Sequence, residues 1–145
     1  MIDIFPQIYA GIKAKLGLYR RSTEGAALLG TRNIEFHNAY TRVEQHFPSV
    51  TVEEKRNAIS EDEMDLVEKR AELVYDVNVY DNGKNRTEVC RKIASVIDEY
   101  MAKEMGFQRT VGEPFPNVGD STIYRYLLRY EGYCDTETGN ITKTK

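Results

Sequence analysis

The side chains that most often carry out chemistry are few in this chain of 145 residues. It has two histidines, His37 and His46, and two cysteines, Cys90 and Cys134, which lie far apart in the sequence. A zinc site needs three or four ligands that converge on one point, and this spacing supplies no compact ligand set. We therefore predict no metal site. We expect both cysteines to be reduced, with Cys90 a packed thiol and Cys134 an inert surface or interface thiol.

Other catalytic patterns are not found either. Gly112 and Gly119 stand near prolines and not between a strand and a helix, so no phosphate-binding loop is predicted. Carboxylates gather only in one stretch from Glu53 to Glu68, where exposure keeps them ordinary. General acid–base catalysis needs partly buried carboxylates with shifted pKa values. We predict that the protein is not an enzyme, with no catalytic residues and no cofactor.

Composition and charge restrict the remaining classes. Hydrophobic residues make up 41% of the chain and charged residues 30%, which is typical of one folded domain over residues 1–145. No run approaches the ~20 apolar residues of a membrane helix, so no membrane partner is expected. The net charge is −3 without a strongly basic block, which disfavours general DNA binding. Glu61, Asp62 and Glu63 belong to an acidic stretch that reads as a solvated loop or a contact surface.

Two elements have clear periodic patterns. Apolar residues alternate with polar ones over about residues 71–80, which predicts a strand with one buried and one wet face. Over about residues 86–105, Val89, Ile93 and Ile97 form an apolar helical stripe, with Asn85 and Glu88 as a capping box and Gly106 as the stop.

The other elements are weaker. We predict a helix over about residues 4–16, capped by Asp3 and ended by Gly17, and strands over about residues 47–57, 107–111 and 122–133. Residues 17–46 form a poorly readable insertion, and residues 134–145 a flexible C-terminal tail with at most a short strand. The predicted fold is α+β, with a mainly antiparallel sheet of about four strands and two helices packed on one face.

Residues 47–133 contain a set of short motifs: Phe47-Pro48-Ser49-Val50, the strand end Asn78-Val79-Tyr80, the Cys-centred helix Val89-Cys90-Arg91-Lys92-Ile93, Gly106-Phe107-Gln108-Arg109, Pro116-Asn117, Asp120-Ser121-Thr122-Ile123-Tyr124-Arg125 and Arg129-Tyr130-Glu131-Gly132. With this set, the stretch resembles the tail terminator (tail-completion) proteins of phages that infect Gram-positive hosts. The resemblance implies the same helix-backed antiparallel sheet.

The resemblance also implies a structural role at the tail–neck junction of a virion, after assembly in the host cytoplasm. Such proteins form a ring, typically of six subunits, that caps the tail tube, stops its growth and joins the tail to the head. The implied partners are further copies of the chain, the tail tube protein, a head-neck connector protein and, in a contractile tail, the sheath protein. DNA would only pass through the channel, and a mildly acidic protein suits that passage.

Interface candidates follow from residue type and position. Tyr80 and Tyr133 have apolar rings with polar tips, which suit contacts between subunits. Arg125 and Arg129 fall on one side of a strand, where they are either wet-face charges or interface partners. Together with Glu61, Asp62 and Glu63, these are the candidate subunit or partner interface.

Two further hypotheses remain open. A head-side neck protein, a stopper or connector that binds the portal or an adaptor, also forms rings, and its partner would distinguish it. A small intracellular enzyme or regulator unrelated to phages would need a deep pocket with convergent polar groups and shifted pKa values.

Overall fold

The computed structural model describes residues 3–38, 46–59, 70–116 and 119–143. Its helices are α1 (Phe5–Arg21), α2 (Thr23–Leu29) and α3 (Arg86–Asp98), which continues into the π-helical segment η1 (Glu99–Glu104). Its strands are β1 (Glu35–His37), β2 (Ser49–Ile59), β3 (Arg70–Asp81), β4 (Gln108–Phe115), β5 (Tyr124–Asp135) and β6 (Ile141–Thr142).

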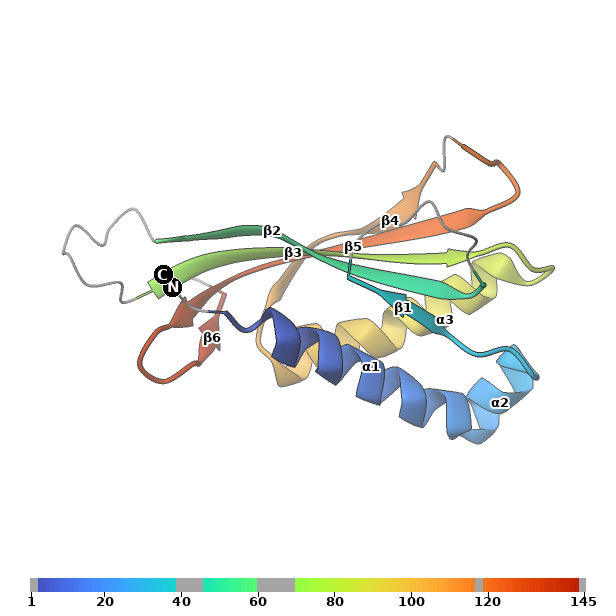
Figure 1. The fold of residues 1–145 in the computed structure, drawn as a ribbon, viewed down its shortest axis with the longest axis horizontal. Helices are drawn as coiled ribbons and strands as arrows, with labels where there is room; N and C mark the ends of the chain where they lie inside the picture. The colour runs from blue at the N-terminus through green and yellow to red at the C-terminus, as the bar shows by residue number, and fades with distance from the viewer. Residues whose placement is uncertain (1–2, 39–45, 60–69, 117–118, 144–145) are drawn as a thin grey trace.

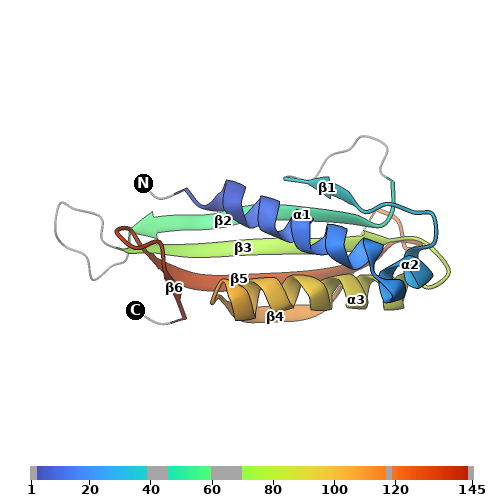
Figure 2. The ribbon, with the colours of Figure 1, turned by 90° about the horizontal axis from the view of Figure 1, so that it is seen from below.

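The strands form one sheet in the order β1-β2-β3-β5-β4, and β6 pairs with β5 beside this path. β1 runs parallel to β2, and the other pairs are antiparallel. Helices α1 and α3 lie on the same face of the sheet (Figures 1 and 2). The predicted α+β class is confirmed, but the prediction of four strands and two helices was too simple, since the described sheet is mixed and has six strands.

The shared face of the helices and the sheet holds the core. The predicted apolar stripes are fully or almost fully buried there: Ile8, Ile12 and Leu16 of α1, Val89, Ile93 and Ile97 of α3, and Leu73, Tyr75, Val77 and Val79 of β3. The Tyr75 and Phe107 rings pack in a T-shaped arrangement with a centroid distance of 5.7 Å. Burial of these side chains is the main stabilisation of the fold.

Several predicted helix boundaries were wrong. α1 passes through Gly17 and ends at Arg21, because Ser22 closes it with its backbone N–H and then caps α2, where its Oγ accepts from Gly25 N at 3.1 Å. Gly17 has open space around its Cα and is only a weak helix position, not a stop. Asn85 makes no side-chain cap bond, so the predicted capping box is not formed.

The weakly readable parts of the chain contain additional elements. Within residues 17–46 lie the end of α1, then α2 and β1. Within the predicted flexible tail, β6 pairs Ile141 with Cys134 and Thr142 with Tyr133. Strands of two or three residues carry no readable period, because alternation needs at least four residues to be visible in a sequence.

Candidate interaction surface

The histidine and cysteine side chains that could take part in metal or thiol chemistry contact other groups of the same chain. His37 Nε2 is 2.6 Å from Glu35 Oε1. Residues 3–38, 46–59, 70–116 and 119–143 contain no group of three or more His, Cys, Asp and Glu side chains arranged to hold a metal ion. The Cys90 thiol is buried, its Sγ lies 3.7 Å from Val79 O and 3.8 Å from Tyr124 O, and burial raises its pKa to about 12. Cys90 is therefore a packed thiol and a poor nucleophile.

Cys134 differs from its prediction. It is fully buried and belongs to the core cluster, so it is not a surface thiol. Its place on β5, with Tyr130 and Leu128 on the same side of the strand, turns it toward the helices. Burial raises its pKa as well.

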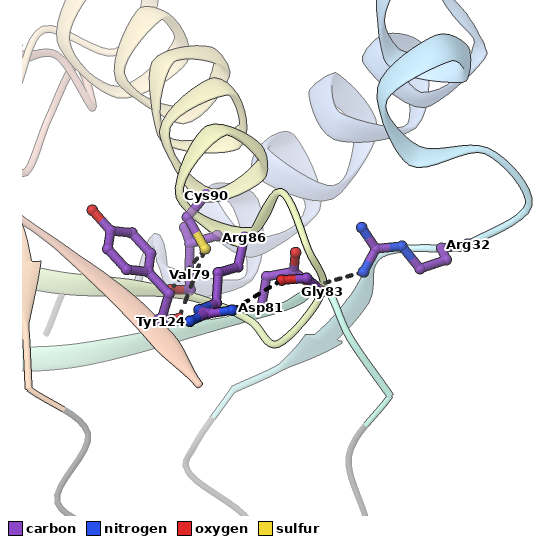
Figure 3. A network of polar contacts seen from close by, with 7 residues as sticks. All are labelled: Arg32, Val79, Asp81, Gly83, Arg86, Cys90 and Tyr124. Carbon is purple, nitrogen blue, oxygen red and sulfur yellow. Dashed lines mark hydrogen bonds and ion pairs between the residues drawn. The ribbon is translucent and has the colours of Figure 1, made fainter. Parts of the chain in front are cut away.

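A polar network fixes the connection between α2 and β1 to the end of β3 (Figure 3). The fully buried Asp81 accepts a hydrogen bond from Arg32 Nη1 at 2.7 Å. Arg20 donates to the backbone oxygens of Arg32 and Gly30, each at 2.7 Å. Only the Asp81 carboxylate of this pair is fully buried, and removing Arg32 would leave it as an unpaired buried charge. The network therefore explains how a stretch without a readable period is held in place.

The adjacent cavity of about 460 Å³ is lined by Arg32, Asn33, Ile34, Glu35, His46 and Phe47. Two of its charged side chains, Arg32 and Glu35, already have partners. Glu35 accepts the His46 backbone N–H at 3.0 Å and lies beside His37, while Arg32 is bound to Asp81. Pairing of this kind supports a structural role for these groups.

The sheet face opposite the helices is covered by arginine side chains. Arg129 forms a two-pronged pair with Asp76, with Nε–Oδ1 at 2.7 Å and Nη2–Oδ2 at 2.9 Å. Arg125 Nε donates to Asn78 Oδ1 at 2.8 Å. As a result, Asp76 and Asn78 are only 5% and 6% exposed. The predicted wet face of β3 was wrong, because the register places Asp76 opposite Arg129 and the long side chains cover the sheet.

The two arginines differ in whether a carboxylate pairs with them. Arg129 is neutralised by Asp76, and the hydrogen bonds to that carboxylate raise the pKa of its guanidinium. The Arg125 guanidinium lies 5.8 Å from the centre of the Tyr80 ring and 5.4 Å from that of Phe115. No carboxylate among the described residues pairs with it. Two aromatic rings therefore orient the Arg125 guanidinium, which can still form an ion pair with a carboxylate.

A groove of about 370 Å³ opens beside Arg125, lined by Pro114, Phe115, Pro116, Ser121, Ile123 and Tyr124. Phe115 is 43% exposed, and among the large apolar side chains of the described part only Leu18 is more so. Phe115 is not among the interface residues that the sequence predicted. The available signal was Pro-Phe-Pro at 114–116, where two rigid residues present an aromatic ring at the end of a strand.

The other predicted interface residues are distributed over the molecule. Tyr80 is buried on the arginine-covered face and lies opposite Arg125 in the register. Tyr133 lies near the far end of β5, where it pairs with Glu72 and Thr142. Glu61, Asp62 and Glu63 lie outside the described residues. The structure therefore brings together Tyr80 and Arg125, with Arg129 further along the same strand face.

Both edges of the sheet are formed by strands that have few or no strand partners on their outer side. Seven of the eight residues of β4 are exposed, and β5 is its strand partner in the described structure. On the other side, β1 pairs only with Ser49, Val50 and Thr51 of β2. The edge of β2 from Val52 to Ile59 has no second strand among the described residues. Such edges present unpaired N–H and C=O groups to another chain.

No protein-family model matches the chain, and no curated protein matches it. Within the described residues, no helix is both long enough and apolar enough to cross a membrane.

Proposed function

We propose that this protein is a structural subunit of a phage tail, a tail-terminator-type protein that forms a ring at the tail–neck junction. The observation that supports this most is the pair of open edges on opposite sides of one helix-backed sheet. The resemblance of residues 47–133 to tail terminator proteins supports the same role.

The two open edges favour a ring of subunits over a symmetric dimer. β4 and the free part of β2 are different surfaces, so joining one to the other is a head-to-tail contact. Head-to-tail contacts repeat from copy to copy and close into a ring if the rotation allows it. Strand pairing between copies also satisfies the backbone groups of both edges at once. Six subunits is the number that the resemblance implies.

The proposed ring has two unlike ends. One end binds the tail tube protein and stops its growth, and the other receives the head-neck connector protein. In a contractile tail, the sheath protein would contact the outside. The net charge of −3 suits a channel that DNA crosses without being retained.

Deletion of the gene from the phage that encodes it tests this role. We expect heads and tails to remain unjoined, with tail tubes of uncontrolled length in electron micrographs. Expression of the intact chain from a plasmid is the control and should restore joined particles. Tails of normal length attached to full heads would rule out the terminator role. Free tails of normal length beside emptied heads would instead favour a head-side neck protein.

A further inference from the structure

We propose that the Arg109 guanidinium on β4 of one subunit pairs with the Glu54 carboxylate on β2 of the next subunit. Arg109 lines a groove of about 310 Å³ between α3 and the sheet. This inference rests on the proposed ring, and it names the contact and the register with which the two open edges join.

The groove carries more positive than negative charge. α3 runs along the β4 side of the sheet (Figure 2), and residues spaced i, i+3, i+4 and i+7 on one face of this helix form one wall. The lining residues are Arg91, Ala94, Ser95 and Asp98 of α3, Arg109 of β4, and Tyr126 and Leu128 of β5. Two arginines beside one aspartate leave a net positive charge, which favours binding of one carboxylate.

Arg109 is oriented before a partner arrives. Its Nη1 lies 3.2 Å from Asp98 Oδ2, and Asp98 Oδ1 accepts a hydrogen bond from the Tyr130 hydroxyl at 2.9 Å. The Arg109 side chain passes over Gly112, where an added Cβ would lie 3.0 Å from Arg109 Nε. The Arg109 side chain is still 48% exposed, so its guanidinium can bind a second carboxylate with little loss of freedom.

Glu54 is the matching carboxylate on the opposite edge of the sheet. It belongs to the part of β2 that has no second strand among the described residues. Its Oε1 accepts a hydrogen bond from the Tyr75 hydroxyl at 2.7 Å. Because Tyr75 is buried in the core, this bond places Glu54 on the helix-covered face of the sheet, as Asp98 does for Arg109. No lysine or arginine in the described part of the chain pairs with Glu54.

The two charges stand in one cross-strand row of the sheet but are apart within a subunit. Glu54 lies opposite Tyr75 of β3. Tyr75 lies opposite Tyr130 of β5, which in turn lies opposite Arg109. Three strand spacings, or about 14 Å, therefore separate the two charged residues, and two tyrosines stand between them. Within one subunit, Glu54 is bound to Tyr75 and Arg109 to Asp98 instead.

Joining the open edges of two copies brings the charges together. β2 and β4 run in opposite directions, because three antiparallel pairings connect them. The β2 edge of an equally oriented copy is therefore antiparallel to β4 and lies one strand spacing of about 4.8 Å away. Equally oriented copies also keep their helices on the same side of the sheet. Glu54 and Arg109 then lie on the same face of neighbouring strands, where opposite charges pair favourably.

β1 limits the register of this joint. It pairs with Ser49, Val50 and Thr51, so the edge of β2 is open only beyond them. A shift of two residues places β4, except its last residue, beside the open edge and keeps every side chain on its face. Glu54 then stands opposite Gly112, over which the Arg109 side chain passes. Without the shift, Glu54 would stand opposite Arg109 itself, but the end of β4 would meet β1.

The test measures assembly of the full-length chain by native mass spectrometry and light scattering over a range of concentrations. Glu54→Lys and Arg109→Glu should each raise the concentration needed for assembly by about tenfold or more, because like charges then face each other. Glu54→Gln keeps an acceptor for the Tyr75 hydroxyl and should raise that concentration by a smaller factor. Lys103→Gln is the control for the loss of one charge, since the Lys103 side chain is 77% exposed on η1, and it should assemble as the parent does.

Mixing the two charge-reversed variants gives the decisive result. In an equimolar mixture, the Glu54→Lys chain and the Arg109→Glu chain can alternate around a ring of even number, and every interface then has opposite charges. We expect the mixture to assemble at the concentration of the parent, which would also show that both variants are folded. Failure of the mixture to recover while each variant keeps the parent's melting temperature would overturn the contact. If a reversed variant melts at a lower temperature, unchanged assembly of Glu54→Gln would overturn it instead.

The remaining outcomes separate this inference from the proposed function. If all three variants form rings like the parent, the contact is wrong and the ring stands. If such rings form but no longer bind tube ends, the groove serves the tube protein and not a second copy. If the parent stays monomeric at every concentration, both the ring and the contact are contradicted.

Discussion

Ile93 lies in the middle of α3 and is completely buried against the sheet. Replacing it with aspartate would bury an unpaired carboxylate, at a cost of several kcal/mol. This is a large part of the ~5–15 kcal/mol that stabilises a typical domain. We expect Ile93→Asp to be largely unfolded or to melt at least about 10 °C lower by circular dichroism. Ser95→Asp is the control on the same helix, since Ser95 is exposed and should change little. An Ile93→Asp protein that melts with the parent would contradict the described packing.

Buried proton donors make the fold sensitive to alkaline pH. Burial raises the pKa of Cys90 from 9.0 to about 12, and it raises the pKa values of Tyr75 and Tyr130 above 10.0. In the unfolded chain these groups lose their protons near their ordinary pKa values. The stabilisation is therefore complete below about pH 9 and is lost as the pH rises from there toward the folded-state values.

The melting temperature as a function of pH measures this loss. It should change little from pH 7 to 8.5 and fall steadily above pH 9. Cys90→Ala should make the first part of the fall shallower, because the thiol is the first of the three groups to ionise in the unfolded chain. A melting temperature that stays constant to pH 11 would show that these groups are solvated in the folded protein.

At the scale of elements, the sequence predicted those helices and strands that are long enough to show several periods of apolar and polar residues. The strand over 71–80 and the helix stripe of Val89, Ile93 and Ile97 span several periods, and both are found in the core. β1 and β6 have three and two residues, and their pairing depends on partners that are distant in sequence or on a turn. The end of α1 was missed for another reason, since Ser22 and not Gly17 satisfies the free backbone groups.

At the candidate interaction surface too, the sequence predicted some of the residues, and only the structure shows how they pair. Residue type indicated Arg125 and Arg129 as a pair of equivalent charges on one strand face. Only the register shows that Asp76 neutralises Arg129, while Arg125 lies near Tyr80 and Phe115. Phe115 could not be found by periodicity, because its importance depends on the end of β4 standing beside the start of β5.

Hydrogen exchange tests the open edges directly. In the proposed ring, amides of β4 and of β2 from Val52 to Ile59 should exchange more slowly at concentrations where the chain assembles than in dilute monomer. Amides of β3 and β5 are the internal control, because both strands already have partners on both sides. Equal exchange of the β4 amides in assembled and monomeric protein would show that this edge does not form the contact.

At the scale of the whole molecule, the two layers give the protein two unlike faces. One face of the molecule is formed by α1 and α3 (Figures 1 and 2). On the other face, Arg129 pairs with Asp76 and Arg125 with Asn78. In the proposed ring, every subunit repeats this difference with the same orientation. The ring would therefore have a helical surface and a sheet surface that can bind different partners.

The pairing of Asp76 with Arg129 has a consequence for anything that slides across the sheet face. A polyanion slows where it meets fixed cations, because each one holds a phosphate for a short time. Here Arg129 is already neutralised by Asp76, and Asn78 accepts the hydrogen bond of the Arg125 Nε. A moving polyanion would therefore bind only weakly where it passes Arg129.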